Sequence, residues 1–220
     1  IHHIREFLEH VPRRGDVRTP RTVLDYYTEG LSDEDPETRQ RVAEGMADLA
    51  DLYTATGDEA LAHAIAALGA QLLVEKKTEV QNSLSATLVQ LSQLAADGRH
   101  YASVKQVMVQ LSTLMHDQPA LANSLRPRIG MESRVPHFIE EALKKPTVPE
   151  PLLEVLKELP RASALHAAGQ FNQATEKERS DRVIALATAL GPDTVEALRE
   201  TLRSAPDSEA VVTIRLLTRL

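Results

Sequence analysis

DEDPETRQRVAEGMADLADLYTATG, residues 33–57, aligns with EKKTEVQNSLSATLVQLSQLAADGR, residues 75–99, at an offset of roughly 42 positions. An offset of this size is typical of helix-pair repeats. The aligned residues are Glu37 with Glu79, Leu49 with Leu91, Leu52 with Leu94, Val42 with Leu84 and Met46 with Leu88. A second match, about 30 positions apart, aligns Ile184 with Ile214, Leu186 with Leu216, Thr188 with Thr218 and Leu190 with Leu220. These matches predict that the repeat unit is a pair of helices.

Helical periodicity runs through the whole chain, and no stretch alternates apolar and polar residues as a strand does. Four stripes recur at helical spacing: Val42, Met46, Leu49 and Tyr53; Leu61, Ile65, Leu68 and Leu72; Leu84, Leu88, Leu91 and Ala95; Val104, Met108, Leu111 and Met115. The connections between stripes are short, which places consecutive helices antiparallel as hairpins. We therefore predict an all-α fold of roughly a dozen helices arranged as an α-solenoid.

The C-terminal stretch LGPDTVEALRETLRSAPDSEAVVTIRLLTRL, residues 190–220, resembles a HEAT-type repeat. The resemblance implies inward positions on a first helix at Val195, Leu198 and Leu202, and on a second helix at Val211, Ile214, Leu217 and Leu220. Residues 33–52 are similar to the second helix of such a unit, with Arg39 where the family usually carries arginine, whereas Val212 stands at that position in the last repeat. Residues 57–69 and 97–111 are also compatible with tetratricopeptide-like pairs.

Three segments follow from these patterns. We expect N-terminal helices and a basic linker over 1–31, helical repeats over 32–130, and HEAT-like repeats over 131–220 that are incomplete at the C-terminus. Leu216, Leu217 and Leu220 would leave an apolar face at the last helix. Because terminal repeats need polar caps, we expect a following repeat to cover this face, with a homodimer contact or a helix folding back as alternatives.

Two groups of residues could in principle bind a metal ion. His2, His3 and His10 occur with Glu6 and Glu9, but their spacing is not that of a zinc protease. The acidic residues Asp33, Glu34, Asp35 and Glu37 lack the glycine and final glutamate of a calcium loop, and helix capping accounts for them. We predict no metal site, no catalytic residue and no cofactor.

Other charged residues give only weak signals for a binding site. Arg13, Arg14, Arg18 and Arg21 could contact an anion or keep an exposed linker soluble, and the Arg14-Gly15-Asp16 tripeptide has little weight as an adhesion signal. Neither the Glu140 and Glu141 pair nor the Glu176 and Glu178 pair resembles a paired-carboxylate site. In solenoids the exposed positions of second helices often line a concave face, here Arg182, Arg215 and Arg219.

Composition narrows the classes of function. The formal charge of −7 disfavours nucleic acid as a partner, the absence of cysteine favours the cytoplasm, and no run of residues is apolar enough to span a membrane. We expect a non-catalytic protein–protein interaction or scaffolding module whose partner is another protein or the rest of a longer chain. The alternatives are a nucleic-acid-binding helical array and a repeat-based enzyme such as a lyase, which would need converging side chains with perturbed pKa values.

Overall fold

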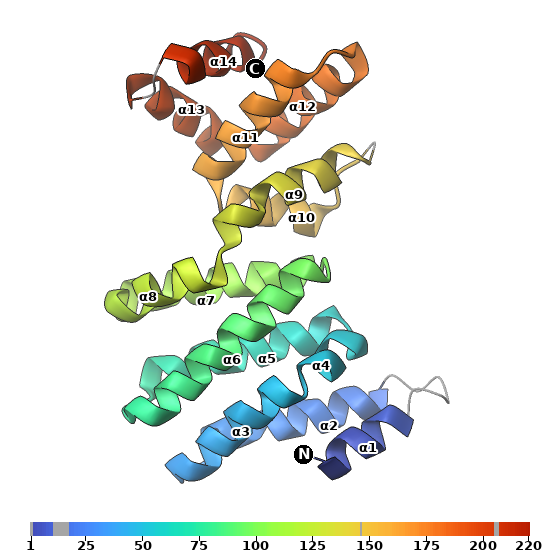
Figure 1. Cartoon of the computed structure of the whole chain (residues 1–220), viewed down its shortest axis with the longest axis vertical. Coiled ribbons are helices and arrows are strands. Elements are labelled where there is room, and N and C mark those ends of the chain that lie inside the picture. Colours follow the sequence, from blue (N-terminus) through green and yellow to red (C-terminus); the bar gives the residue numbers. More distant parts are fainter. Residues whose placement is uncertain (1, 11–17, 146, 205–206) are drawn as a thin grey trace. The chain divides into compact units, whose positions relative to one another are not determined.

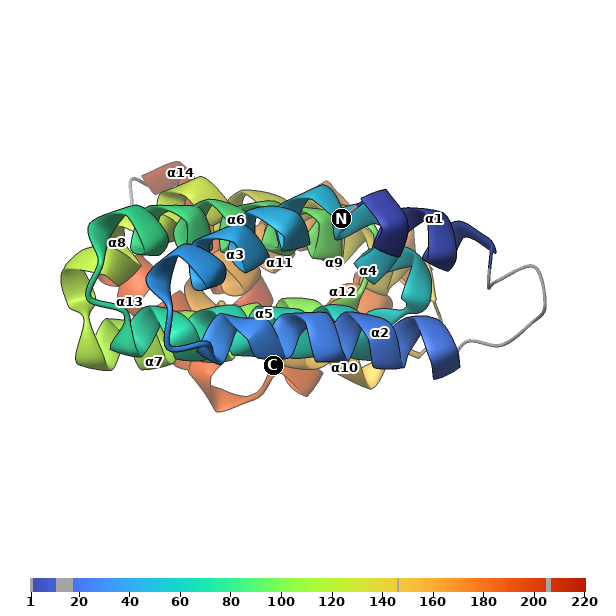
Figure 2. The same cartoon turned by 90° about the horizontal axis from the view of Figure 1, so that it is seen from below.

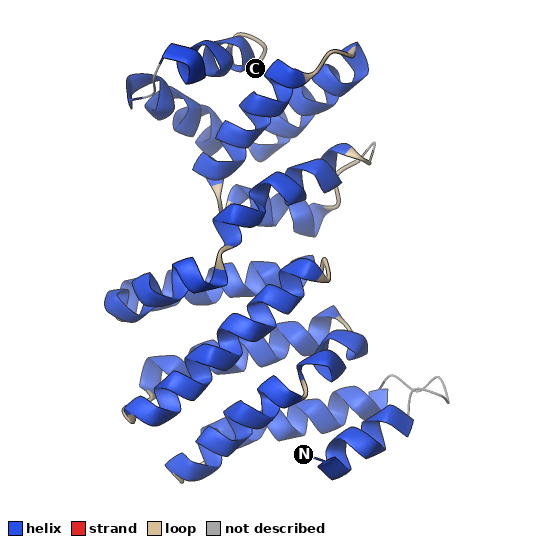
Figure 3. Cartoon of the chain, viewed as in Figure 1, coloured by secondary structure: helices blue, strands red, loops and turns tan. Residues whose placement is uncertain are grey.

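A computed structural model describes residues 2–10, 18–145, 147–204 and 207–220, without the side chains of 8–10, 18, 19, 204 and 207–209. These residues form helices and connecting turns and contain no strand, so the predicted all-α class is confirmed (Figure 3). Fourteen α-helices and one 3₁₀ turn lie in this part of the chain, against the roughly a dozen predicted. They are α1 (His2–His10), α2 (Arg18–Glu29), η2 (Gly30–Ser32), α3 (Pro36–Asp48), α4 (Ala50–Thr56), α5 (Asp58–Val74), α6 (Thr78–Asp97), α7 (Tyr101–Asp117), α8 (Pro119–Ile129), α9 (Met131–Leu143), α10 (Glu150–Lys157), α11 (Pro160–Gln173), α12 (Lys177–Leu190), α13 (Pro192–Ser204) and α14 (Asp207–Leu217).

The chain divides into two compact units, an N-terminal unit of residues Ile1–Gly130 and a C-terminal unit of residues Met131–Leu220. Gly130 ends α8 with a φ of 68°, a left-handed conformation that glycine adopts without steric cost. Each unit has its own buried apolar side chains.

Helices of the N-terminal unit alternate between two layers (Figures 1 and 2). One layer contains α2, α5 and α7, and the other contains α3, α6 and α8. Successive members of a layer pack against each other, and the short turns between α5 and α6 and between α7 and α8 join the layers. Each such connection reverses the chain, as predicted from the spacing of the helix-breaking residues.

Side-chain hydrogen bonds fix the register of the first layer. His63 Nδ1 of α5 lies 2.8 Å from Asp25 Oδ1 of α2. Glu59, also on α5, forms an ion pair with Arg21 of α2. Between α5 and α7, the carboxylate of Asp58 accepts hydrogen bonds from the first turn of α7, while the amide of Gln118 donates to the carbonyl of Leu72 at the far end. Because residue numbers rise together on both helices, neighbours in this layer run parallel.

The two segments that align in sequence occupy equivalent places in the second layer. Residues 35–48 form α3 with its cap, residues 78–97 form α6, and these two helices pack side by side. Thr87 Oγ1 of α6 donates to the carbonyl of Ala43 at 2.9 Å, and Gln90 Nε2 donates to the carbonyl of Ala47 at 3.0 Å. The internal match therefore corresponds to two adjacent helices.

Three of the four predicted apolar stripes are buried along their length, those on α3–α4, α5 and α6. The helix is interrupted at Leu49, between α3 and α4, whereas the spacing of this stripe predicts one continuous helix. On α7 the predicted stripe is only partly right, because Met108 and Met115 are half-buried while Val107 and Leu114 are fully buried. The buried face of α7 is thus rotated toward Val107, since this helix contacts α5, α6 and α8.

In the C-terminal unit, α11 packs against α9, α12, α13 and α14. Three of the four inward positions expected on the last helix are wrong: Val211 and Ile214 are each 48% exposed, and Leu220, beyond the end of α14, is 41% exposed. The fourth, Leu217, is half-buried, and the buried residues are Thr213 and Leu216. The helix is rotated because α11 and α13 both contact it on the side that carries Leu216. On α13, the expected Leu198 is buried, but Val195 and Leu202 are only half-buried.

Candidate functional site

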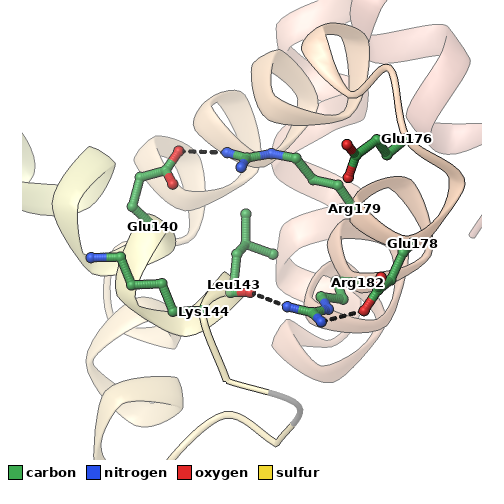
Figure 4. A pocket seen from close by; sticks show the side chains of 7 residues that line it. All are labelled: Glu140, Leu143, Lys144, Glu176, Glu178, Arg179 and Arg182. Carbon is green, nitrogen blue, oxygen red and sulfur yellow. Dashed lines mark hydrogen bonds and ion pairs between the residues drawn. The ribbon is translucent and has the colours of Figure 1, made fainter.

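A polar hollow of about 210 Å³ lies between α9 and α12 in the C-terminal unit (Figure 4). Its lining combines three cations with three carboxylates around one apolar side chain. The lining residues are Glu140, Leu143, Lys144, Glu176, Glu178, Arg179 and Arg182. The fold brings together four residues that the sequence analysis names separately. They are the carboxylates Glu140, Glu176 and Glu178 and the arginine Arg182.

Two arginines of α12 are held in place by α9. Arg179 Nη2 donates to Glu140 Oε1 at 2.8 Å and to Gln170 Oε1 of α11 at 2.7 Å. Arg182 Nη1 donates to the carbonyl of Leu143 at 3.0 Å, which is one of the carbonyls at the end of α9 that have no partner within the helix. Arg182 also pairs with Glu178 on its own helix. Both guanidinium groups are therefore oriented before anything binds.

The remaining charges are less constrained. Lys144 Nζ lies 2.6 Å from Glu141 Oε1, and its side chain is 63% exposed, whereas that of Glu141 is 10% exposed. Glu176, the N-cap residue of α12, makes no side-chain capping hydrogen bond. Its carboxylate points toward the hollow in Figure 4. Lys144 and Glu176 therefore offer one exposed charge of each sign to a binding partner.

Four of the charged groups that line this hollow form two ion pairs, Arg179 with Glu140 and Arg182 with Glu178. The nearby group with a perturbed pKa is His166 of α11, whose pKa is lowered by burial, while the charge of Glu140 opposes that effect. His166 does not line the hollow.

Glu75 has a strongly perturbed carboxylate that the sequence patterns do not single out. Glu75, at the end of α5, has a side chain only 1% exposed, and it faces Arg39 of α3. Arg39 Nε and Nη2 donate to the two carboxylate oxygens at 2.7 and 3.1 Å, and the backbone N–H groups of Lys76 and Lys77 each donate at 2.9 Å. These bonds, led by that from Arg39, lower the pKa of Glu75 to about 2. The HEAT-like arginine position was the available signal, but its partner lies 36 residues away.

The acidic residues before α3 cap that helix, as predicted. Asp35 accepts hydrogen bonds from the backbone N–H of Glu37 at 3.2 Å and of Thr38 at 3.0 Å. The hydroxyl of Thr38 and these amides lower the pKa of Asp35. Asp33 accepts from the Asp35 N–H at 2.8 Å, so this cluster satisfies free amides at the helix start.

The basic and histidine-rich N-terminal residues are described only in part. His2 and His3 are exposed on α1, the side chains of Glu9 and His10 lie outside the described residues, and so do Arg13, Arg14 and the side chain of Arg18. Arg21 pairs with Glu59. Among the side chains that the structure describes, no group of three or more His, Asp and Glu residues is arranged to hold a metal ion.

The other two arginines singled out in the sequence lie apart from the hollow's lining. Arg215 Nη1 donates to Asn172 Oδ1 of α11 at 2.8 Å, and Arg219 follows the end of α14 as an exposed residue. Only Arg182 of the three lines the hollow.

Within the described ranges, no helix combines the length and the apolar character needed to cross a bilayer.

Comparison with known proteins gives no family. No protein-family model and no curated protein matches the chain. Eight chains of solved structures match it, among them the crystal structure of an engineered protein, a target of the Northeast Structural Genomics Consortium. That match has 15% sequence identity, covers 89% of this chain and 95% of the engineered one, and has a TM-score of 0.29. A TM-score this low carries no inference about fold or function.

Proposed function

We propose that this chain is a protein–protein interaction or scaffolding module, built as an α-solenoid of HEAT-type helix pairs, and that it has no catalytic role. We place it in the cytoplasm, because the sequence contains no cysteine. Its binding partner would be another protein or a further part of a longer chain.

The repeat architecture is supported by the sequence separation of contacts between helices. Hydrogen bonds that join α2 to α5, α3 to α6 and α5 to α7 connect residues 38 to 46 positions apart. In the C-terminal unit, the bonds from α12 to α9 span 39 positions, and the bond from α14 to α11 spans 43. A contact separation near the length of one helix pair is expected when each pair packs on the next.

The hollow between α9 and α12 is the observation that favours binding over catalysis. Its guanidinium groups are held by neighbouring carboxylates and carbonyls, so a partner meets preorganised donors with little side-chain entropy left to lose. Exposed Lys144 and Glu176 then set the sign of the charges that the partner must present. This arrangement suits a protein surface of mixed charge, because a polyanion would meet three carboxylates.

Perturbed pKa values also have structural explanations. Arg5 lowers the pKa of Asp51, Arg39 lowers that of Glu75, and burial raises that of Tyr53, whose hydroxyl lies 2.8 Å from Thr28 Oγ1. These groups hold helices together, and none of them lines the hollow.

The test is capture of partners from an extract of the source organism with the full chain as bait, in parallel with a Lys144→Glu/Glu176→Lys double variant. Glu150→Lys is the control, because Glu150 is exposed at the start of α10, outside the hollow's lining. We expect a protein retained near stoichiometrically by the wild type and the control and lost by the double variant. Retention by all three would refute the hollow as the contact site.

The same experiment tests the role itself. If no protein is retained near stoichiometrically, the interaction function is wrong. If nucleic acid is retained instead, with an affinity that falls steeply as salt is added, the chain is a nucleic-acid-binding array.

A further inference from the structure

On the outward face of α2, α5 and α7 in the N-terminal unit, the central helix α5 has no titratable side chain between its ends except His63, whereas α2 carries Arg21, Asp25 and Glu29. Residues 60–74 of α5 contain no Asp, Glu, Lys or Arg. Their solvent side carries the alanines at 66, 67 and 70 and the exposed His63, which lies 2.8 Å from Asp25 of α2, with Val74 65% exposed at the end of the helix. On the flanking helices of the same layer, Tyr26 of α2 is 77% exposed and Val109 of α7 is 43% exposed.

The two layers of this unit differ in exposed apolar side chains. Tyr26, Val74 and Val109, which are three of the most exposed large apolar residues, all belong to α2, α5 and α7. None of the described side chains of that kind belongs to α3, α6 or α8. Protein interfaces are depleted of charge at their centre and enriched in aromatic anchors such as tyrosine, so this face has the composition of an interface.

Charges at the two ends of α5 complement each other. The side chain of Glu59, which also pairs with Arg21, is 79% exposed at the start of the helix, and Lys76 and Lys77 are exposed just beyond its end. If two copies of α5 pack antiparallel about Leu68, Ala66 of one copy lies opposite Ala70 of the other. The same register brings Glu59 of one copy to the end of α5 of the other, where Lys76 and Lys77 follow the helix. An identical helix is therefore a partner that matches both the uncharged centre and the charged ends.

The size of the face also fits a modest dimer contact. With a rise of 1.5 Å per residue and neighbouring axes about 9 Å apart, α2, α5 and α7 present a footprint of about 600 Å². Stable interfaces bury about 800 Å² per partner, and weaker ones bury less. Alanine side chains allow close approach of the helices and lose no rotamer freedom when they are buried.

We propose that the face of α2, α5 and α7 is a homodimer interface in which α5 packs antiparallel against α5 of a second copy of this chain. This contact is separate from the α9–α12 hollow, so it goes beyond the proposed binding function and does not depend on it. The footprint predicts a dimer that dissociates in the micromolar range.

Sedimentation equilibrium of the full chain over a range of micromolar concentrations tests the dimer. Ala70→Glu would place an unpaired charge at the centre of the contact twice, and should weaken dimerisation by at least about tenfold. Ala86→Glu is the matched control, because Ala86 is an exposed alanine in the interior of α6, on the other layer. Both substitutions are at exposed positions, and circular dichroism checks that each variant is folded. A wild type that stays monomeric, or a dimer unaffected by Ala70→Glu, would overturn the proposal.

Two further measurements test the orientation. Because the chain has no cysteine, Ala66→Cys mixed with Ala70→Cys reports the register directly. We expect the mixed disulfide to exceed the symmetric disulfide of either variant alone, and the reverse result would overturn the antiparallel arrangement. Glu59→Lys and Lys77→Glu should each weaken the dimer, and the double exchange should restore it; failure of the double variant to recover would contradict the pairing.

Discussion

The Arg39–Glu75 pair ties the start of α3 to the end of α5, and its removal should cost the N-terminal unit a measurable part of its stability. The carboxylate is almost fully buried and accepts four hydrogen bonds from Arg39 and the following backbone amides. Glu75→Gln keeps the size of the side chain but removes its charge, so Arg39 loses its ionic partner. The remaining amide also presents a donor to a guanidinium group.

The pKa of Glu75 gives the magnitude. The contacts lower it from an ordinary value of 4.5 to about 2. At about 1.4 kcal/mol for each pKa unit, the ionised carboxylate contributes about 3 kcal/mol to the free energy of unfolding at neutral pH. Because the folded-state pKa is the lower one, this contribution is complete above pH 4.5 and is lost as the pH falls toward 2.

Urea denaturation followed by circular dichroism at pH 7 and pH 3 measures this effect. The wild type should exceed Glu75→Gln by about 3 kcal/mol at pH 7 and by about half as much at pH 3. Glu29→Gln is the control, since Glu29 is an exposed carboxylate of the same unit, and it should change stability little at either pH. A gap between wild type and Glu75→Gln that is equal at both pH values would show that the pair does not act through its charge.

Three other substitutions test the packing of the helices. Asp58→Ala removes the acceptor for two backbone amides of the first turn of α7 and should lower the free energy of unfolding by about 1–2 kcal/mol. Hydrogen exchange should become faster only at the amides of that turn. Unchanged exchange there would refute capping of α7 by α5. Gly69→Ala would place a Cβ 2.1 Å from Gln110 Oε1. The alanine should therefore stabilise α5 by about 1 kcal/mol only when Gln110 is also replaced by alanine, as measured by thermal denaturation. An equal gain from Gly69→Ala alone would exclude the clash. Thr194→Val removes a buried hydroxyl that has no hydrogen-bond partner among the described residues and should raise the free energy of unfolding by about 1 kcal/mol; a lower stability in urea would show that the hydroxyl is satisfied.

The candidate site shows the limit of sequence reasoning for charged residues. Glu140 and Arg179 are 39 positions apart, and so are Leu143 and Arg182. No local spacing in the sequence therefore predicts either contact. Glu176 and Glu178 are neighbours in the sequence, but nothing in their local spacing connects them with α9. Only the packing of α12 on α9 brings the opposite charges together.

Local sequence determined what depends on neighbours along the chain. The period of Leu61, Ile65, Leu68 and Leu72 gave a helix with one buried side, and Asp35 before Pro36 gave a capped helix start, because both depend on side chains within a turn or two of each other. The internal match likewise identified α3 and α6 as equivalent elements. Which side of α14 is buried was decided only by tertiary structure. Its sequence offers apolar residues around most of the helix, and the contacts of α11 and α13 select Leu216 and leave Ile214 in solvent.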